Sequence, residues 1–129
     1  MWQLMRLYLI SFGQPGSVIE GAPYGPPQTL TCEWFTNFEN SRFGQCKTPT
    51  GTDVPLGEGA SVKCLKGICD QLDAEARRAS HSTDRSPPSG IFTVRLVGRL
   101  SLYQHPKRYL GDGTSTVLIE KLIAVRKSQ

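Results

Sequence analysis

The chain has 129 residues, of which 38% are hydrophobic and 20% charged, and this composition excludes wholesale disorder. A chain of this length forms one domain, residues 1–129, that buries a core without needing a metal or disulfides. Residues 1–90 carry eight Lys and Arg against nine Asp and Glu, and residues 91–129 carry seven against two, which gives the net charge of +4. An anionic partner would use this asymmetry, although a solvated face kept for solubility explains it equally well.

The N-terminal stretch does not have the pattern of a signal peptide or a membrane span. Arg6 interrupts its apolar residues, the run Leu7–Ile10 is short, and no small-residue cleavage pattern follows. No apolar run in the chain reaches the roughly twenty residues needed to cross a bilayer. We therefore expect a cytoplasmic protein without membrane association.

In that reducing compartment the four cysteines are expected to be free, buried thiols. No two of them have the C-x2-C spacing of a zinc knuckle, and the two histidines, His81 and His105, do not complete a ligand set. Neither a metal nor another cofactor is expected. The cysteines are Cys32, Cys46, Cys64 and Cys69.

The predicted elements, in chain order, are mainly strands separated by loops rich in Gly and Pro. Strand formers and alternating apolar residues predict strands at residues 2–12, 29–38, 42–47, 61–68, 91–104 and 116–126, with room for a short one at Ser17–Glu20. In the second of these, Trp34 and Phe35 point to opposite faces, and we favour Trp34 as the core residue. Cys69, Leu72 and Ala76 have helical spacing and predict one short helix from about residue 69 to 79.

The segment 80–90 contains no apolar residue and two prolines, which is typical of a flexible linker. The residues after it, 91–126, form a long basic hairpin with Gly98 in the middle of its first strand. A glycine there is typical of a sharp bend at a barrel corner. Strands, one short helix and two long strands in this order predict an all-β fold with one helix, a five-stranded OB-fold barrel.

Four segments, in order, resemble the bacterial and phage single-stranded-DNA-binding protein family. These are MRLYLISFGQPGSVIEGAPYG, TLTCEWFTNF, SVKCLKGICDQLDAEARRA, and VRLVGRLSLYQ followed by a basic tip and TVLIEKLIAV. The last has the V-x-x-x-G-x-L pattern, a protruding hairpin and an apolar strand. The chain departs from the family in its long linker, in ending at VRKSQ without an acidic tail, and in placing Lys66 where a stacking aromatic is usual.

The resemblance implies binding of single-stranded DNA (RNA is an alternative) without strong sequence preference, in DNA replication or recombination. It implies a minimal module of the kind phages and mobile elements carry, which would act in the host cell's cytoplasm. It also implies a homodimer or homotetramer, because several weak grooves bind one strand by avidity.

Binding of single strands requires aromatic faces for the bases and cations along the phosphates. The candidate aromatic platforms are Trp34, Phe35, Phe38, Phe43, Tyr103 and Tyr109. The candidate cations are Arg42, Lys63, Lys66, Arg95, Arg99, Lys107, Arg108 and Lys121. Lys107 and Arg108, flanked by the two tyrosines at a loop tip, are the strongest pair.

The chain is not expected to be an enzyme. It contains no G-x-S-x-G, P-loop or H-E-x-x-H motif, and neither histidine is placed as a base. The segment GDGTS at 111–115 opens a strand rather than a helix, so we interpret it as a turn. Two alternatives to nucleic-acid binding stay open: a small-barrel protein-interaction subunit, and a zinc-stabilised domain using the four cysteines.

Overall fold

The computed structural model describes residues 17–19, 22–37, 40–81, 87–109 and 111–128. A hairpin of β1 (Ser17–Ile19) and β2 (Ala22–Tyr24) comes first. The remaining elements are β3 (Gln28–Thr36), β4 (Ser41–Lys47), β5 (Ala60–Cys64), α1 (Ile68–Ala79), β6 (Gly90–Leu100) and β7 (Ser115–Lys127). The strands predicted from residue 29 onward and the helix are confirmed, with their ends shifted by a few residues. The strand predicted at residues 2–12 lies outside the described residues.

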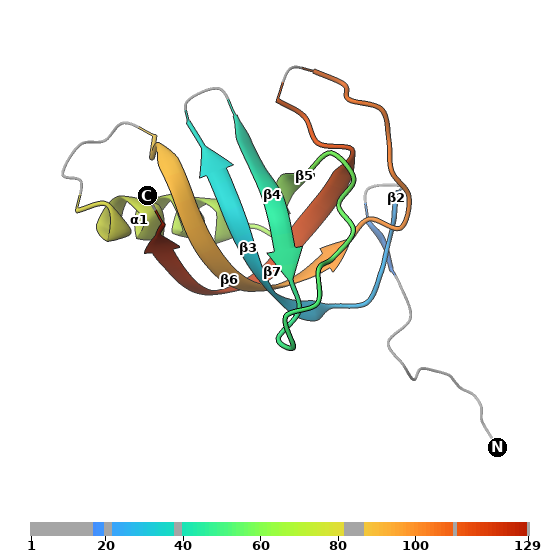
Figure 1. Cartoon of the computed structure of the whole chain (residues 1–129), viewed down its shortest axis with the longest axis horizontal. Coiled ribbons are helices and arrows are strands. Elements are labelled where there is room, and N and C mark those ends of the chain that lie inside the picture. Colours follow the sequence, from blue (N-terminus) through green and yellow to red (C-terminus); the bar gives the residue numbers. More distant parts are fainter. Residues whose placement is uncertain (1–16, 20–21, 38–39, 82–86, 110, 129) are drawn as a thin grey trace.

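The five longer strands form one sheet that closes into a ring, in the order β3-β4-β5-β7-β6, with β6 returning to β3 (Figure 1). Neighbouring strands are antiparallel except β5 and β7, which run parallel. The expected mostly-β architecture with one short helix is confirmed. The ring closes without residues 2–12, so β3 is its first strand, one element later than the sequence order suggested.

The inner faces of these strands supply the core because their apolar residues alternate with polar ones. Trp34 and Phe92 lie on neighbouring strands with ring centroids 5.4 Å apart, and the Trp34 indole donates a 2.8 Å hydrogen bond to the Ser41 hydroxyl. The exposed fraction is 1% for Trp34 and 38% for Phe35, which confirms Trp34 as the core residue.

Gly98 lies where β6 bends, as predicted. The register between β6 and β7 shifts between Val97 and Gly98, and Figure 1 shows β6 as a strongly curved strand. A Cβ at Gly98 would come within 2.8 Å of both the Leu118 carbonyl oxygen and the Leu96 side chain. The close backbone approach therefore requires glycine at this position.

Helix α1 lies behind the sheet in Figure 1 and packs against β7 and β5. Leu72 and Ala76, one helical turn apart, are buried in the core. The residue before the helix, Gly67, has a φ of 84°, a conformation that glycine adopts at little cost. The chain therefore turns sharply between the end of β5 and the start of α1.

The cysteines form two disulfides, Cys32–Cys46 and Cys64–Cys69, and the expectation of free thiols is wrong. Cys32 and Cys46 are register partners on β3 and β4, with Cα atoms 4.0 Å apart, which brings their side chains together in the core. Sequence spacing could not reveal this pairing because the two residues meet only through the strand register. Since all four sulfurs are in disulfides, the structure also contradicts a four-cysteine zinc site.

The structure describes only part of the segment between α1 and β6 and only part of the hairpin that follows. Ser80 donates its backbone N–H to Ala76, which ends the helix, and residues 82–86 of the predicted linker lie outside the described residues. The long hairpin is present as the antiparallel pair β6 and β7.

Candidate functional site

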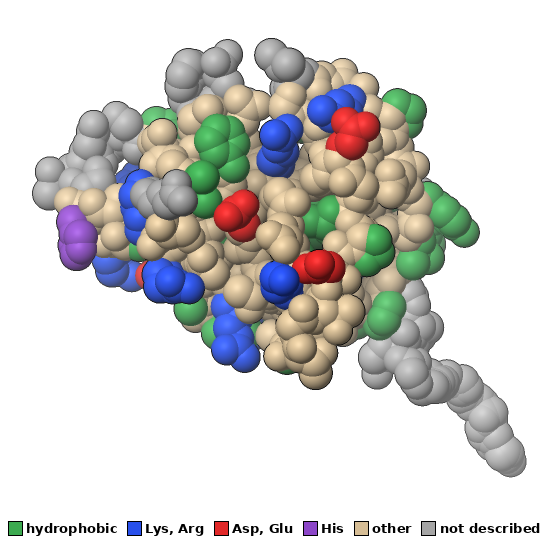
Figure 2. Space-filling model, viewed as in Figure 1, with side chains coloured by type: hydrophobic (Ala, Val, Ile, Leu, Met, Phe, Trp, Pro, Cys, Tyr) green, Lys and Arg blue, Asp and Glu red, His purple; other side chains and the backbone are tan. Residues whose placement is uncertain are grey.

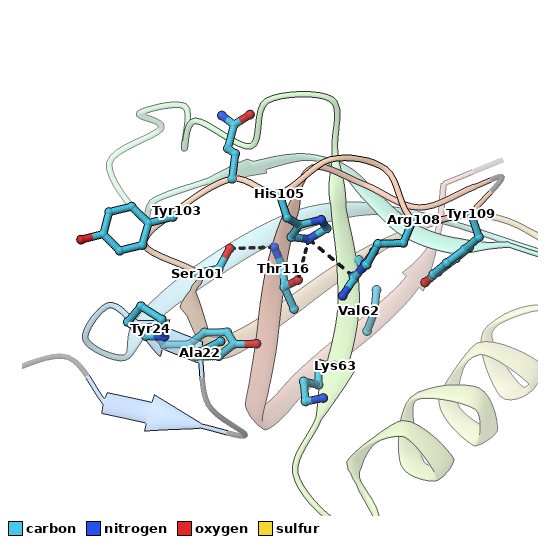
Figure 3. Close-up of a pocket in the computed structure, with 13 residues that line it drawn as sticks. Ala22, Tyr24, Val62, Lys63, Ser101, Tyr103, His105, Arg108, Tyr109 and Thr116 are labelled. Carbon is cyan, nitrogen blue, oxygen red and sulfur yellow. Dashed lines mark hydrogen bonds between the residues drawn. The ribbon is translucent and has the colours of Figure 1, made fainter.

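A groove of about 580 Å³ lies over β5, and we call it the β5 groove (Figure 3). Its floor is the Ser61–Lys63 segment of β5, and its walls come from β2 and from the 101–114 segment that joins β6 to β7. A smaller hollow shares Ser61, Val62 and Tyr109 with this groove and continues it toward the turn between β3 and β4. The groove leaves part of β5 uncovered, because β4 pairs with only two residues of β5, Ser61 and Ala60.

Two exposed tyrosines stand at the groove. The exposed fraction is 73% for Tyr103 and 60% for Tyr109, and both come from the 101–114 segment. Figure 3 shows them at opposite ends of the groove, with His105 and Arg108 between them. A third tyrosine, Tyr24, lines the groove but is only 4% exposed. Both exposed rings line the groove, and neither belongs to the core.

The shape of the 101–114 segment depends on the fully buried carboxylate of Asp112. Its Oδ1 accepts a 2.5 Å hydrogen bond from the Ser61 hydroxyl, and its Oδ2 accepts 2.9 Å bonds from the Arg108 backbone N–H and from Arg108 Nε. The Arg108 guanidinium, followed by the Ser61 hydroxyl, holds the pKa of Asp112 well below its usual range although burial opposes this. Asp112 therefore ties the tyrosine-bearing segment to the floor of the groove.

The cations that the sequence favoured are partly neutralised by acidic partners. Besides Arg108, Lys107 lies 3.5 Å from the Glu58 carboxylate. Arg99 bonds to Glu120 at 2.7 Å and to the Gly25 carbonyl at 3.1 Å, and its side chain is only 15% exposed. Because these pairs offset the positive charges of Arg108, Lys107 and Arg99, the electrostatic attraction for an anion is weaker than the count of Lys and Arg predicts.

A second set of candidates lies on the outer face of β3, β4, β6 and β7 and does not line the groove, although Arg42 is the register partner of Ser61 on the groove floor. Phe35 is opposite Arg42 in the β3–β4 register, Arg95 is opposite Thr31 on β3, and Lys121 is opposite Val97 on β6. Figure 2 shows Lys and Arg side chains interspersed with Asp and Glu on the face that it presents. The described residues of that face form no continuous basic stripe.

The structure thus brings together four of the predicted site residues, Lys63, Tyr103, Arg108 and Tyr109, around the β5 groove. It removes Trp34 and Phe43 from the candidate platforms, because their side chains are 1% and 0% exposed. Phe38 lies outside the described residues. The remaining candidates lie elsewhere on the surface: Phe35, Arg42, Lys66, Arg95, Arg99, Lys107 and Lys121.

Sequence reasoning missed several residues of the groove. His105 lines it with its Nδ1 2.9 Å from the Pro106 carbonyl and its Nε2 3.4 Å from the Thr116 hydroxyl. Asp112, inside the GDGTS turn, organises the loop, and Ser61 is its partner 51 residues away. Neither a motif nor a spacing links Ser61 to Asp112, so only the fold reveals this contact.

Within the described ranges, no group of three or more His, Cys, Asp or Glu is placed to hold a metal ion. Among the same residues, no helix is long and apolar enough to cross a membrane. Comparison of the chain with family models, with curated proteins and with solved structures finds no match.

Proposed function

We propose that the ring is a five-stranded OB-fold barrel that binds a single-stranded nucleic acid in the β5 groove. The strand order supports the fold, because α1 lies between the third and fourth strands of the ring and the third and fifth run parallel. In OB-folds, the second and third strands and the loops after the first and fourth strands bind oligonucleotides. Here those loops are the β3–β4 turn and the 101–114 segment, and both line the groove or its extension.

The observation that carries the proposal is the pair of exposed tyrosines at the two ends of this groove, with Lys63 and Arg108 also lining it. Aromatic faces stack on bases of any sequence, and nearby cations contact the phosphates between them. Buried core packing does not explain rings that are 73% and 60% exposed. The ligand class that matches both features is a flexible strand with bases that are free to stack.

The proposal does not include the cytoplasmic location that the sequence predicted. Two disulfides favour an oxidising environment, so the expected cytoplasmic location and the associated role in replication or recombination have no support here. We retain the binding of single strands itself, and a homodimer or homotetramer would strengthen it by avidity.

The test is a fluorescence-anisotropy titration of labelled oligothymidylate with wild-type protein and four variants. Tyr103→Ala and Tyr109→Ala are each expected to weaken binding by about 1–3 kcal/mol, roughly 5- to 150-fold in Kd. Phe35→Ala, which removes a ring from the outer face, is the matched control and should leave Kd unchanged. Lys63→Gln should lower the slope of log K against log salt by about 0.7, as loss of one phosphate contact does.

Equal losses for the outer-face and groove aromatics would contradict the location of the site, and no binding at low salt would contradict the function. The acid partners of Arg108, Lys107 and Arg99 favour a second candidate, a small-barrel protein-interaction subunit whose basic residues serve structure. That candidate requires a protein partner whose binding persists when Lys107 and Arg108 are both replaced by Gln, together with no affinity for oligothymidylate.

A further inference from the structure

The two disulfides occupy different environments, and the difference points to a chemical role for one of them. Cys32 and Cys46 are 1% and 0% exposed, inside the core between β3 and β4. Cys69 is exposed and Cys64 is half-buried, at the junction of β5 and α1. A thiol in solution can reach the second disulfide without unfolding of the ring, whereas the first is covered by core side chains.

The Cys64–Cys69 disulfide closes a segment that other contacts already hold in place. The two residues are five positions apart, and closure of this loop removes less entropy from the unfolded chain than closure of the 14-position loop of Cys32–Cys46. The Leu65 N–H bonds to the Ile119 carbonyl at 3.0 Å, the Ile68 N–H bonds to the Leu65 carbonyl at 3.0 Å, and the Gln71 N–H bonds to the Gly67 carbonyl at 3.1 Å. Opening of the disulfide therefore leaves the β5–α1 junction folded.

Cys69 also has a local environment that favours a thiolate. It is the second residue of α1, and no side chain of the described residues caps the N-terminus of this helix. The N–H groups of a first helical turn stabilise negative charge, so after reduction the Cys69 thiolate is the better placed of the two sulfurs to attack an external disulfide and reverse the exchange. Lys66, three positions earlier, adds a positive charge, and Asp70, next to Cys69, partly offsets it.

We propose that Cys64–Cys69 is a redox-active disulfide that exchanges reversibly with low-molecular-weight thiols, with Cys69 as the exposed, reacting sulfur. A thiolate RS⁻ attacks Cys69 Sγ, a Cys69–S–S–R mixed disulfide forms, and the Cys64 sulfur leaves as a thiolate that takes up a proton. A second RS⁻ then attacks the R sulfur, releasing RSSR and the Cys69 thiolate. Two external thiols are oxidised to one disulfide while the protein disulfide gains two electrons.

The test equilibrates the whole oxidised protein with mixtures of reduced and oxidised glutathione, then quenches by alkylation and measures each cysteine by peptide mass spectrometry. The expected result is reduction of Cys64–Cys69, with glutathionylated Cys69 as the intermediate, at ratios where Cys32–Cys46 stays oxidised and circular dichroism stays native. Reduction of both disulfides together, only as the protein unfolds, would overturn the proposal. Resistance of Cys64–Cys69 over the whole range of ratios would overturn it as well.

Two single-cysteine variants separate the roles of the two sulfurs. In Cys64→Ser, the remaining Cys69 thiol should react with iodoacetamide at pH 7 at least about fivefold faster than the Cys64 thiol does in Cys69→Ser. Equal or reversed rates would contradict the assignment of Cys69. The glutathione titration of the wild-type protein needs neither variant to fold, and neither experiment depends on nucleic-acid binding.

Discussion

Replacement of Asp112 by Asn removes the charge that holds the 101–114 segment to β5 while keeping the side chain's shape. Both carboxylate oxygens act as acceptors: Oδ1 accepts from Ser61 and from an Arg108 terminal nitrogen, and Oδ2 accepts from the Arg108 backbone N–H and Nε. An amide NH2 cannot accept, so in either orientation of the new amide at least one donor faces another donor. The substitution therefore breaks contacts that no rotation of the new side chain restores.

The expected cost of Asp112→Asn is about 2–3 kcal/mol of unfolding free energy. Hydrogen bonds to a charged group are worth about 1.5–3 kcal/mol each, but the Arg108 side chain is 58% exposed and water screens its share. The Ser61 hydroxyl, in contrast, is buried with the carboxylate. The total thus lies above that of a surface ion pair and below the roughly 3–5 kcal/mol of a fully buried one.

The direction in which the Asp112 contribution to stability changes with pH follows from the pKa of Asp112. The pKa of Asp112 is lowered in the folded protein, chiefly by the hydrogen bond from Arg108, so the folded state binds the proton less readily than the unfolded state. Its contribution to stability is present above the usual aspartate pKa of about 3.9 and is lost as the pH falls below it. The difference between wild type and Asp112→Asn should therefore narrow progressively below about pH 4.

Urea unfolding at pH 7 and at a series of lower pH values measures both quantities. Asp53→Asn is the matched control, because Asp53 also pairs with a cation, Lys47, and also has a lowered pKa, but its side chain is 70% exposed. The control should change stability little at any pH. If Asp112→Asn were as mild as Asp53→Asn, or if its cost grew as the pH fell, the structural role assigned to Asp112 would be refuted.

Three further substitutions test the ring by urea unfolding at pH 7. Gly98→Ala should destabilise the protein by about 1–3 kcal/mol, because the new Cβ would lie 2.8 Å from the Leu118 carbonyl oxygen. An unchanged stability would contradict this close approach. Trp34→Ala should lower the free energy of unfolding by about 3–5 kcal/mol, because it removes a large side chain from the core. A loss as small as that of a surface substitution would contradict the core position of Trp34. The double variant Cys32→Ala with Cys46→Ala should cost about 3 kcal/mol through the loss of a loop closure of 14 positions, and equal stability with and without the bond would contradict that.

Much of the fold could be predicted from the sequence because its signals are local. Alternation predicts that Trp34 and Phe35 lie on opposite faces, helical spacing predicts α1, and a glycine within a long apolar strand predicts the bend at Gly98. These features depend on neighbouring residues, and a single sequence contains that information. The first strand, predicted at residues 2–12 from strand formers and alternation, lies outside the described residues and stays a prediction.

The errors come from contacts between distant residues. Whether Cys32 pairs with Cys46 depends on the β3–β4 register, and the expectation of free thiols rested on an assumed compartment. Phe43 is an aromatic residue next to Arg42, which suggests a stacking role, but its side chain points into the core. Lys107 and Arg108 were selected as cations, and only the fold shows that Glu58 and Asp112 lie beside them.

The most direct test of the proposed function is an NMR titration of ¹⁵N-labelled protein with unlabelled oligothymidylate, which maps the contact surface residue by residue. We predict saturable chemical-shift changes at Lys63, Tyr103, Arg108 and Tyr109 around the β5 groove, and little change at Phe35, Arg95 and Lys121 on the outer face. Shifts confined to the outer face, or no shifts at low salt, would contradict the account.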